Sequence, residues 1–210
     1  MSTGFGIDTP GIKNQIKSYE KAGKIDASSN LSGHKVFIFS GKSDSTVCNK
    51  VAQAGEQLYK DLGADVKVKY DFPAAHTMPT VNYGNICTLA MKPFIGKCSY
   101  NGAFEALNSL FDGKLTQGSG KYIKSNLYSV SQKTSGTSMG PKAYVYAPTA
   151  CKEKDANCPL HVVFHGCQQT INDIQMQYVE NTGYNEVAED NNLIILYPQV
   201  VSSMLTNPNG

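Results

Sequence analysis

The stretch KVFIFSGKSD, residues 35–44, decides the fold class of this 210-residue chain. Its first five residues form a short apolar run rich in aromatic side chains, and Gly41 ends the run. Such a run is typical of a buried strand. Similar runs follow in LHVVF at 160–164, which we expect to be a central strand, and in LIILY at 193–197. Strands without polar alternation are covered on both faces, which predicts an α/β fold.

The segments between these strands carry helical patterns. Their apolar residues recur at helical spacing, and glycine ends several of them. The alternating run at 66–70 predicts a strand nearer the sheet edge. Neither an internal repeat nor a linker divides the chain, so we expect one α/β domain over residues 1–210, with helices on both faces of its sheet. The expected helices are 8–23, 47–62, 103–111 and 173–190, further strands lie near Tyr128 and at 143–147, and 80–100 is an irregular excursion.

Composition narrows the classes of partner. Charged residues make up 17% of the chain, the net charge is +2, and every one of the 19 basic residues is lysine. Without arginine or a basic cluster, we expect no nucleic-acid partner. No apolar run approaches the roughly 18 residues of a membrane span. Residues 1–13 lack the basic segment and apolar core of a secretory signal, whereas Asn30-Leu31-Ser32 is a glycosylation acceptor pattern that agrees with an extracellular location.

The cysteines favour short local disulfides. Cys87 and Cys98 bracket one polar or proline-containing loop, and Cys151 and Cys158 bracket another. Reduced, half-buried thiols are the alternative. Because no two cysteines form a CxxC pair, we expect no zinc site, and we expect no other metal or cofactor.

Two polar residues follow the first two predicted strands. Asp44 lies on the turn after the first strand, and His76 lies on a small-residue loop between two prolines after the second. One helix and one strand fit between them, as the acid and histidine of a Ser-His-Asp relay require. The alternatives are an Asp44 that caps the helix starting near Val47 and a His76 that is an ordinary surface-loop histidine.

A third element follows the strand at 160–164. In His165-Gly166-Cys167 the glycine lets the backbone bend so that successive N–H groups point into a cleft, as in an oxyanion loop. An ordinary strand-ending turn would have the same sequence. Dinucleotide binding would need a GxGxxG pattern, which is absent here.

The nucleophile is the missing part of this pattern. The only G-x-S-x-G match contains Ser138, but a polar loop precedes it and Pro141 leads from it into a strand. A nucleophile elbow requires a strand before the serine and a helix after it, so we expect Ser138 to be a loop residue. The thiol of Cys167, acting with His76 and Asp44, is a possible substitute nucleophile.

At these residues the sequence resembles the secreted poly(3-hydroxybutyrate) depolymerases of the circularly permuted, single-domain type. The resemblance implies an α/β-hydrolase-like sheet, an extracellular location and a short-chain hydroxyalkanoate polyester as substrate. It places Asp44 and His76 in the catalytic triad, and makes the backbone N–H of Cys167 an oxyanion donor. The matching segments are KVFIFSGKSDSTV, AAHTMPT, NICTLAMKPFIGKCSYNGAFEALNSLF, AYVYAPTAC, CPLHVVFHGCQQT, NTGYNEVAEDNNLIILYPQ and the terminal NPNG.

Two departures from this family pattern stand out. Family members carry the serine segment and its strand ahead of the position of Met1, and a Cys-Trp-rich stretch after NPNG, whereas this sequence contains neither and has no tryptophan. We therefore expect an incomplete, permuted sheet that lacks its nucleophile strand and exposes apolar edges through which copies can associate. Cys167 would then lack a disulfide partner, and Cys48 would be an odd thiol.

The expected function is that of an incomplete polyester depolymerase. In the complete enzyme His76 would take the proton of the serine, Asp44 would hold His76 in the productive tautomer, and the Cys167 N–H would stabilise the oxyanion. The chain alone would have negligible serine-esterase activity. The alternatives are a catalytically inactive descendant that binds an extracellular polymer, and a thiol hydrolase that uses Cys167.

Overall fold

The computed structural model describes residues 6–203, 207, 208 and 210, and it forms two compact units. Unit 1 comprises the described part of residues 1–77 together with 87–90 and 106–113. Unit 2 comprises residues 78–86 and 91–105 and the described part of 114–210. The expectation of a single domain over residues 1–210 stays a prediction. Within the terminal NPNG segment, Asn209 lies outside the described residues.

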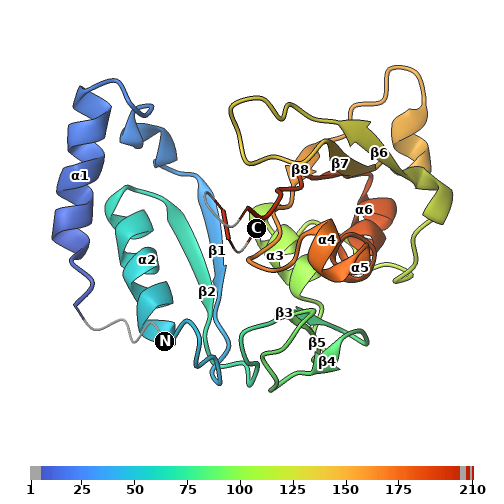
Figure 1. Cartoon of the computed structure of the whole chain (residues 1–210), viewed down its shortest axis with the longest axis horizontal. Helices are drawn as coiled ribbons and strands as arrows, with labels where there is room; N and C mark the ends of the chain where they lie inside the picture. Colours follow the sequence, from blue (N-terminus) through green and yellow to red (C-terminus); the bar gives the residue numbers. More distant parts are fainter. Residues whose placement is uncertain (1–5, 204–206, 209) are drawn as a thin grey trace. The chain divides into compact units, whose positions relative to one another are not determined.

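Unit 1 is built on a pair of parallel strands. Strand β1 (Lys35–Phe39) pairs in register with β2 (Asp65–Lys69), and α2 (Asn49–Asp61) connects them and packs on both. Helix α1 (Thr9–Lys21) packs on α2, and the short helix η1 (Ser28–Leu31) leads into β1 (Figure 1). These bounds confirm the two helices and two strands that the sequence predicts at the start of the chain.

Unit 2 contains a mixed sheet with the strand order β6-β7-β9-β8. The pairs β6–β7 and β7–β9 are antiparallel, whereas β8 and β9 are parallel. A second, parallel sheet has the order β3-β5-β4, and α3 (Gly102–Leu110) runs from unit 2 into unit 1. The strands are β3 (Met78–Thr80), β4 (Asn85–Ile86), β5 (Ile95–Lys97), β6 (Leu127–Ser131), β7 (Lys142–Tyr146), β8 (Leu160–Val162) and β9 (Ile194–Tyr197), and the short helices are η2 (Lys124–Asn126) and η3 (Thr149–Lys152).

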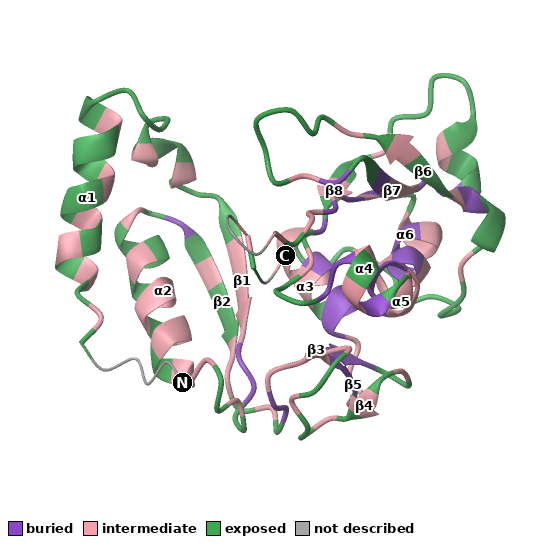
Figure 2. Ribbon diagram, viewed as in Figure 1, coloured by how far each residue is buried: buried purple, intermediate pink, exposed green. Residues whose placement is uncertain are grey.

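The core of unit 2 lies between β9 and the helices that cover it. Helix α6 (Tyr184–Asn191) packs on β9, and buried residues gather on both elements (Figure 2). Tyr197 is fully buried, and its hydroxyl donates to Asn185 Oδ1 at 2.7 Å. The Asn185 amide in turn donates to the Val179 carbonyl at 2.8 Å. The side chains of Tyr197 and Asn185 thus have hydrogen-bond partners inside this core, as buried polar groups require.

The prediction of one continuous helix over 173–190 is wrong. The segment folds as α4 (Ile171–Ile174), α5 (Gln177–Asn181) and α6. Gln175 (φ 55°) and Gly183 (φ 92°) have positive φ angles at the two junctions, and a residue with positive φ cannot continue a right-handed helix. The apolar spacing continues across both junctions, so periodicity alone does not reveal them.

The expectation that residues 160–164 form a central strand is also wrong for the described residues. There β8 has β9 as its only strand partner and lies at the edge of the sheet. Leu160 is 60% exposed and Phe164, just beyond the strand, is 70% exposed. An apolar run of this kind is typical of a strand with a neighbour on each side. Among the described strands, β8 has a neighbour only on the side of β9.

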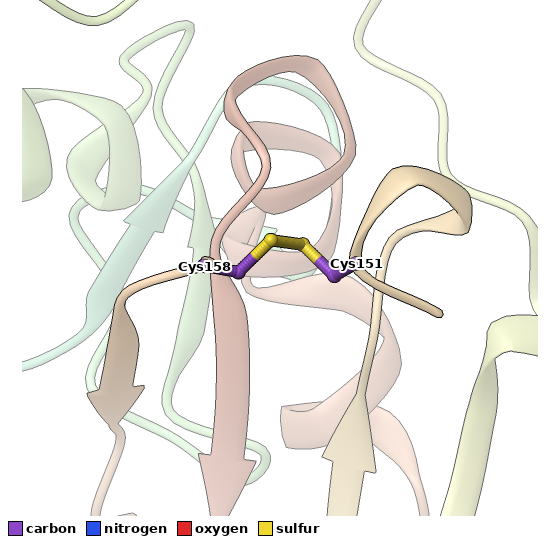
Figure 3. The surroundings of a disulfide bond; sticks show 2 residues. All are labelled: Cys151 and Cys158. Atoms are coloured by element: carbon purple, nitrogen blue, oxygen red, sulfur yellow. A yellow bond between two sulfur atoms is a disulfide. The ribbon is translucent and has the colours of Figure 1, made fainter. Parts of the chain in front are cut away.

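The excursion at 80–100 contains more structure than expected, since β4 and β5 lie within it. Cys151 and Cys158 form a disulfide that joins η3 to the start of β8 (Figure 3). Cys87 and Cys98 are disulfide-bonded as well, whereas Cys48 and Cys167 are free thiols. A disulfide that closes so short a loop stabilises the fold by about 2 kcal/mol, mainly by restricting the unfolded chain.

We expect the Cys151→Ser/Cys158→Ser double variant to lower the free energy of unfolding by about 2 kcal/mol, because the unfolded chain regains the freedom of this loop. Urea unfolding followed by circular dichroism would measure the change. Cys167→Ser is the matched control, since it replaces an exposed free thiol and should shift the free energy by less than about 0.5 kcal/mol. Equal effects of the two changes would contradict the prediction.

Candidate catalytic site

The loops that follow β1 and β2 are joined by backbone hydrogen bonds. Parallel strands place their carboxyl ends at one edge of a sheet, and ligand sites in α/β folds lie beyond that edge. The pairing continues past the last residues of both strands, so the two loops leave the sheet side by side. The bonds run from Ser40 N to Lys69 O (3.0 Å), from Lys42 N to Phe72 O (2.7 Å) and from Ser43 N to Ala74 O (3.0 Å).

Gly41 is the point of closest approach between these loops. A Cβ atom at this position would lie 2.1 Å from the carbonyl oxygen of Ala74, whereas real Cβ contacts essentially never fall below 3.0 Å. The backbone of Ala74 cannot move away without breaking its bond to Ser43 N. Glycine is therefore required here for close packing of two backbones.

Asn49, the first residue of α2, ties the loops to that helix. Its Oδ1 accepts a hydrogen bond from the Ser40 hydroxyl at 2.6 Å, and its Nδ2 donates to the Tyr70 carbonyl at 3.1 Å. The Tyr70 hydroxyl donates to Glu56 Oε2 at 3.0 Å, about two turns further along the same helix. Burial, together with the Glu56 carboxylate, raises the pKa of Tyr70 to about 12, so the hydroxyl stays a donor at neutral pH.

Within this frame the structure brings Asp44 and His76 together. His76 Nδ1 lies 2.8 Å from Asp44 Oδ2. The Asp44 side chain is 8% exposed and the His76 side chain is 43% exposed. The other carboxylate oxygen, Oδ1, accepts from the backbone N–H groups of Thr46 (2.9 Å) and Val47 (2.8 Å). Both oxygens of Asp44 are thus engaged, which holds the carboxylate in a single orientation.

This geometry fixes the tautomer of the imidazole. A carboxylate only accepts hydrogen bonds, so the neutral ring carries its proton on Nδ1 and presents Nε2 as an acceptor. Among the described residues we find no hydrogen-bond partner for His76 Nε2. A half-exposed imidazole with a buried carboxylate behind it and an open Nε2 is the arrangement of a general base.

The capping alternative for Asp44 is resolved by the same contacts. The N-cap residue of α2 is Cys48, four residues after Asp44, and helix α2 begins at Asn49. Asp44 instead stabilises the turn that precedes the helix while it also binds His76. The surface-loop alternative for His76 does not account for its bond to a buried carboxylate.

The turn at residues 165–167 belongs to unit 2. The Gly166 N–H donates to Gln169 Oε1 at 2.9 Å, and the Gln169 N–H donates back to the Gly166 carbonyl at 3.2 Å. Cys167 is exposed and its thiol is free. We find no acceptor for the Cys167 backbone N–H within the part of the chain that the structure describes. An unoccupied, fixed N–H group is what an oxyanion donor requires.

Ser138 lies in an exposed loop between β6 and β7, as expected, without the strand-turn-helix setting of a nucleophile elbow. Across the described ranges, His, Cys, Asp and Glu side chains nowhere gather in threes that could hold a metal ion. None of the described helices is long and apolar enough to cross a membrane. Sequence reasoning missed Asn49 and Gln169, because nothing in a single sequence distinguishes a bridging carboxamide from a surface one.

Comparisons with known proteins agree on one group of enzymes. A poly(3-hydroxybutyrate) depolymerase of Delftia acidovorans is 37% identical over 99% of this chain and 43% of its own length. A polyhydroxybutyrate depolymerase of Talaromyces funiculosus is 35% identical over the whole chain and 66% of its own length. The chain thus spans less than two thirds of either relative. No protein-family profile matches it.

Solved structures give the same result. The crystal structure of the PHB depolymerase from Penicillium funiculosum matches with a TM-score of 0.84 and 32% identity, over 94% of this chain and 63% of that one. A serine-to-alanine PHB depolymerase complexed with an R3HB trimer matches with a TM-score of 0.82, at the same identity and coverage. The α/β-hydrolase-like fold that the sequence predicts is therefore confirmed.

We expect Gly41→Ala to lower the free energy of unfolding by about 1–3 kcal/mol, because the added methyl group overlaps the Ala74 carbonyl. Gly55→Ala is the matched control. Gly55 lies within α2 with no atom within 4 Å of an added Cβ, so alanine there should raise the free energy by about 0.5–1 kcal/mol. Urea unfolding would measure both changes, and a neutral Gly41→Ala would contradict the close approach.

We expect ¹⁵N NMR of the neutral His76 ring to show the proton on Nδ1, and Asp44→Ala to shift the ring toward the Nε2–H tautomer. The reason is that Asp44 is the only acceptor of the Nδ1 proton among the residues that the structure describes, and the variant removes it. The exposed His34 serves as the internal control, and its ring signals should not change. A neutral His76 that is protonated on Nε2 in the unaltered chain would contradict the proposed arrangement.

Proposed function

The chain belongs to the poly(3-hydroxybutyrate) depolymerase family, and from that premise we propose that it supplies the acid, the base and one oxyanion donor of a serine esterase. The substrate class is a short-chain hydroxyalkanoate polyester. The observation that carries this proposal is the 2.8 Å contact between His76 Nδ1 and a nearly buried Asp44 carboxylate, with His76 Nε2 left open.

Each residue has a defined part in this reaction. His76 Nε2 takes the hydroxyl proton as the serine oxygen bonds to the ester carbonyl carbon, and the Cys167 N–H stabilises the resulting oxyanion. The intermediate collapses, the ester C–O bond breaks, and the leaving alcohol takes the proton from His76. Water then attacks the acyl-serine with His76 as base again, which releases the acid and restores the serine. Asp44 holds the ring and stabilises the imidazolium that forms in each half-reaction.

We propose that the serine lies outside these 210 residues, on a strand that completes the sheet. Ser138, in the only G-x-S-x-G match, lacks the required setting. Among the described strands, β1 pairs only with β2 and β8 pairs only with β9, so each has an open edge that can accept a further strand. Without that strand, the same edges could pair copies of the chain with one another.

The order of the functional elements supports a circular permutation. In an unpermuted α/β-hydrolase the oxyanion loop comes first and is followed by the serine, the acid and the histidine. Here Asp44 and His76 precede the turn at 165–167. We also propose that the protein works outside the cell, which the disulfide-bonded cysteines support because disulfides persist in oxidising compartments.

Two other functions remain as outcomes of the test. A catalytically inactive, polymer-binding protein would adsorb to polyester granules without releasing soluble acid. A thiol hydrolase would use the exposed, free thiol of Cys167 as its nucleophile.

We expect the native protein, isolated from its source and treated with a serine-directed fluorophosphonate, to carry one adduct at an intact mass well above 22.7 kDa. The 210-residue chain alone should carry none. In the complete enzyme, Asp44→Ala should lower kcat on a soluble butyrate ester by roughly 10⁴-fold and His76→Ala by roughly 10⁶-fold.

An unlabelled native species at 22.7 kDa would overturn the serine-esterase proposal. In that case, activity that Cys167→Ser abolishes would support the thiol hydrolase. Adsorption to granules without turnover would support the polymer-binding protein.

A further inference from the structure

Gln169 is a buried carboxamide on the turn that follows β8. Only 7% of the residue is exposed, and both ends of its side chain form hydrogen bonds. Its Oε1 accepts from the Gly166 N–H at 2.9 Å, and its Nε2 donates to the carbonyls of Pro93 (2.9 Å) and Phe94 (3.2 Å). A single side chain therefore connects residues 166 and 93–94 within unit 2.

The acceptors of this carboxamide lie in a well-anchored segment. Residues 93 and 94 directly precede β5, and the Phe94 carbonyl also accepts from the Met78 N–H of β3 at 2.8 Å. Strand β3 therefore holds the Phe94 carbonyl, one of the two to which Gln169 donates, and Pro93 directly precedes it. Because Gln169 Oε1 also accepts from the Gly166 N–H, the side chain fixes the turn relative to this anchored segment.

The bond to Gly166 determines which N–H of the turn stays open. The Gly166 N–H is occupied by Gln169 Oε1, whereas the Cys167 N–H has no acceptor among the described residues. The fit is tight, since a Cβ at Gly166 would lie 2.9 Å from that same Oε1. The Gly166 N–H belongs to the peptide group between His165 and Gly166. Rotation of that group would break the bond to Gln169 and would also change the direction of the next peptide group, which carries the Cys167 N–H.

We propose that Gln169 is the positioning residue of the oxyanion turn, and that it holds the Gly166 peptide so that the Cys167 N–H remains available to the developing oxyanion. The inference rests on the proposed function, in which the Cys167 N–H is an oxyanion donor. Gln169 itself does not touch the reacting atoms. A neutral carboxamide suits this role because one group both accepts and donates without placing a charge in a buried position.

The first test uses the 210-residue chain and does not depend on activity. Gln169→Met keeps the approximate volume of the side chain and removes its hydrogen bonds. We expect amide hydrogen exchange at Gly166 to become at least about tenfold faster, while the buried Ile195 amide in β9 is unchanged. Gln168→Met is the matched control, because it makes the same chemical change at the adjacent, exposed position. Unchanged exchange at Gly166 would overturn the inference.

The second test uses the full-length polypeptide that carries the serine. We expect Gln169→Met to lower kcat on a soluble butyrate ester by about 10- to 100-fold with KM within about twofold, since loss of a whole oxyanion donor costs about 10²- to 10³-fold. Gln168→Met should retain the unaltered kcat. A matching loss of kcat and thermal stability in both variants would indicate a structural role and would overturn the inference.

Gln169→Glu provides a second readout and a variant with nearly the same shape. A charged carboxylate still accepts from Gly166 but cannot donate to residues 93 and 94, whereas a protonated carboxyl regains one donor. The ratio of its kcat to that of the unaltered enzyme should therefore rise as pH falls. A ratio that does not change with pH would contradict the need for a donor at this position.

The two proposals fail in different ways. A full-length enzyme that neither labels nor turns over ester would overturn the proposed function, whatever the exchange at Gly166 shows. An active enzyme in which Gln169→Met keeps its kcat would overturn the positioning role alone.

Discussion

The contact between the backbone at Gly41 and the carbonyl of Ala74 is the constraint on which the Asp-His pair depends. Parallel pairing of β1 with β2 brings two chain segments to one edge of the sheet, but strands alone do not determine how the following loops run. The hydrogen bonds from Lys42 and Ser43 extend the pairing into those loops, and only a residue without a Cβ permits it. The Asp44 carboxylate and the His76 imidazole lie in contact because backbone hydrogen bonds already join the two loops that carry them.

Two uncharged carboxamide side chains each link two chain segments by hydrogen bonds, one beside the Asp-His pair and one at the turn after β8. Asn49 links the loop after β1 to the loop after β2 in unit 1, and Gln169 links the turn after β8 to the segment before β5 in unit 2. Each accepts at its oxygen and donates at its nitrogen. A carboxylate of similar size could satisfy only the accepting contact and an apolar side chain neither, so at least one buried group would lose its partner.

The sequence predicts the elements of unit 1 because they follow from short-range rules: apolar runs and glycine stops. The edge at which parallel strands end makes Asp44 and His76 candidates, but only the family resemblance favours their pairing over a helix cap and a surface-loop histidine. Prediction from the sequence fails where the backbone conformation of single residues or a distant partner decides the outcome. The positive φ angles of Gln175 and Gly183 divide a segment whose apolar spacing is continuous. The run at 160–164 is apolar enough for a central strand, yet the described residues give it one neighbour. Asn49 and Gln169 were missed because their partners lie 21 and about 75 residues away, respectively, along the chain.

The short disulfide has a consequence for a protein that meets proteases. The loop between Cys151 and Cys158 carries Lys152 and Lys154, and both are exposed. Exposed polar loop tips are preferred sites of proteolytic nicking. A cut after Lys154 would divide the polypeptide in two, but the sulfur–sulfur bond would keep β7 and β8 covalently linked across the gap. The nicked protein would therefore remain one molecule under oxidising conditions and separate into two chains only when reduced.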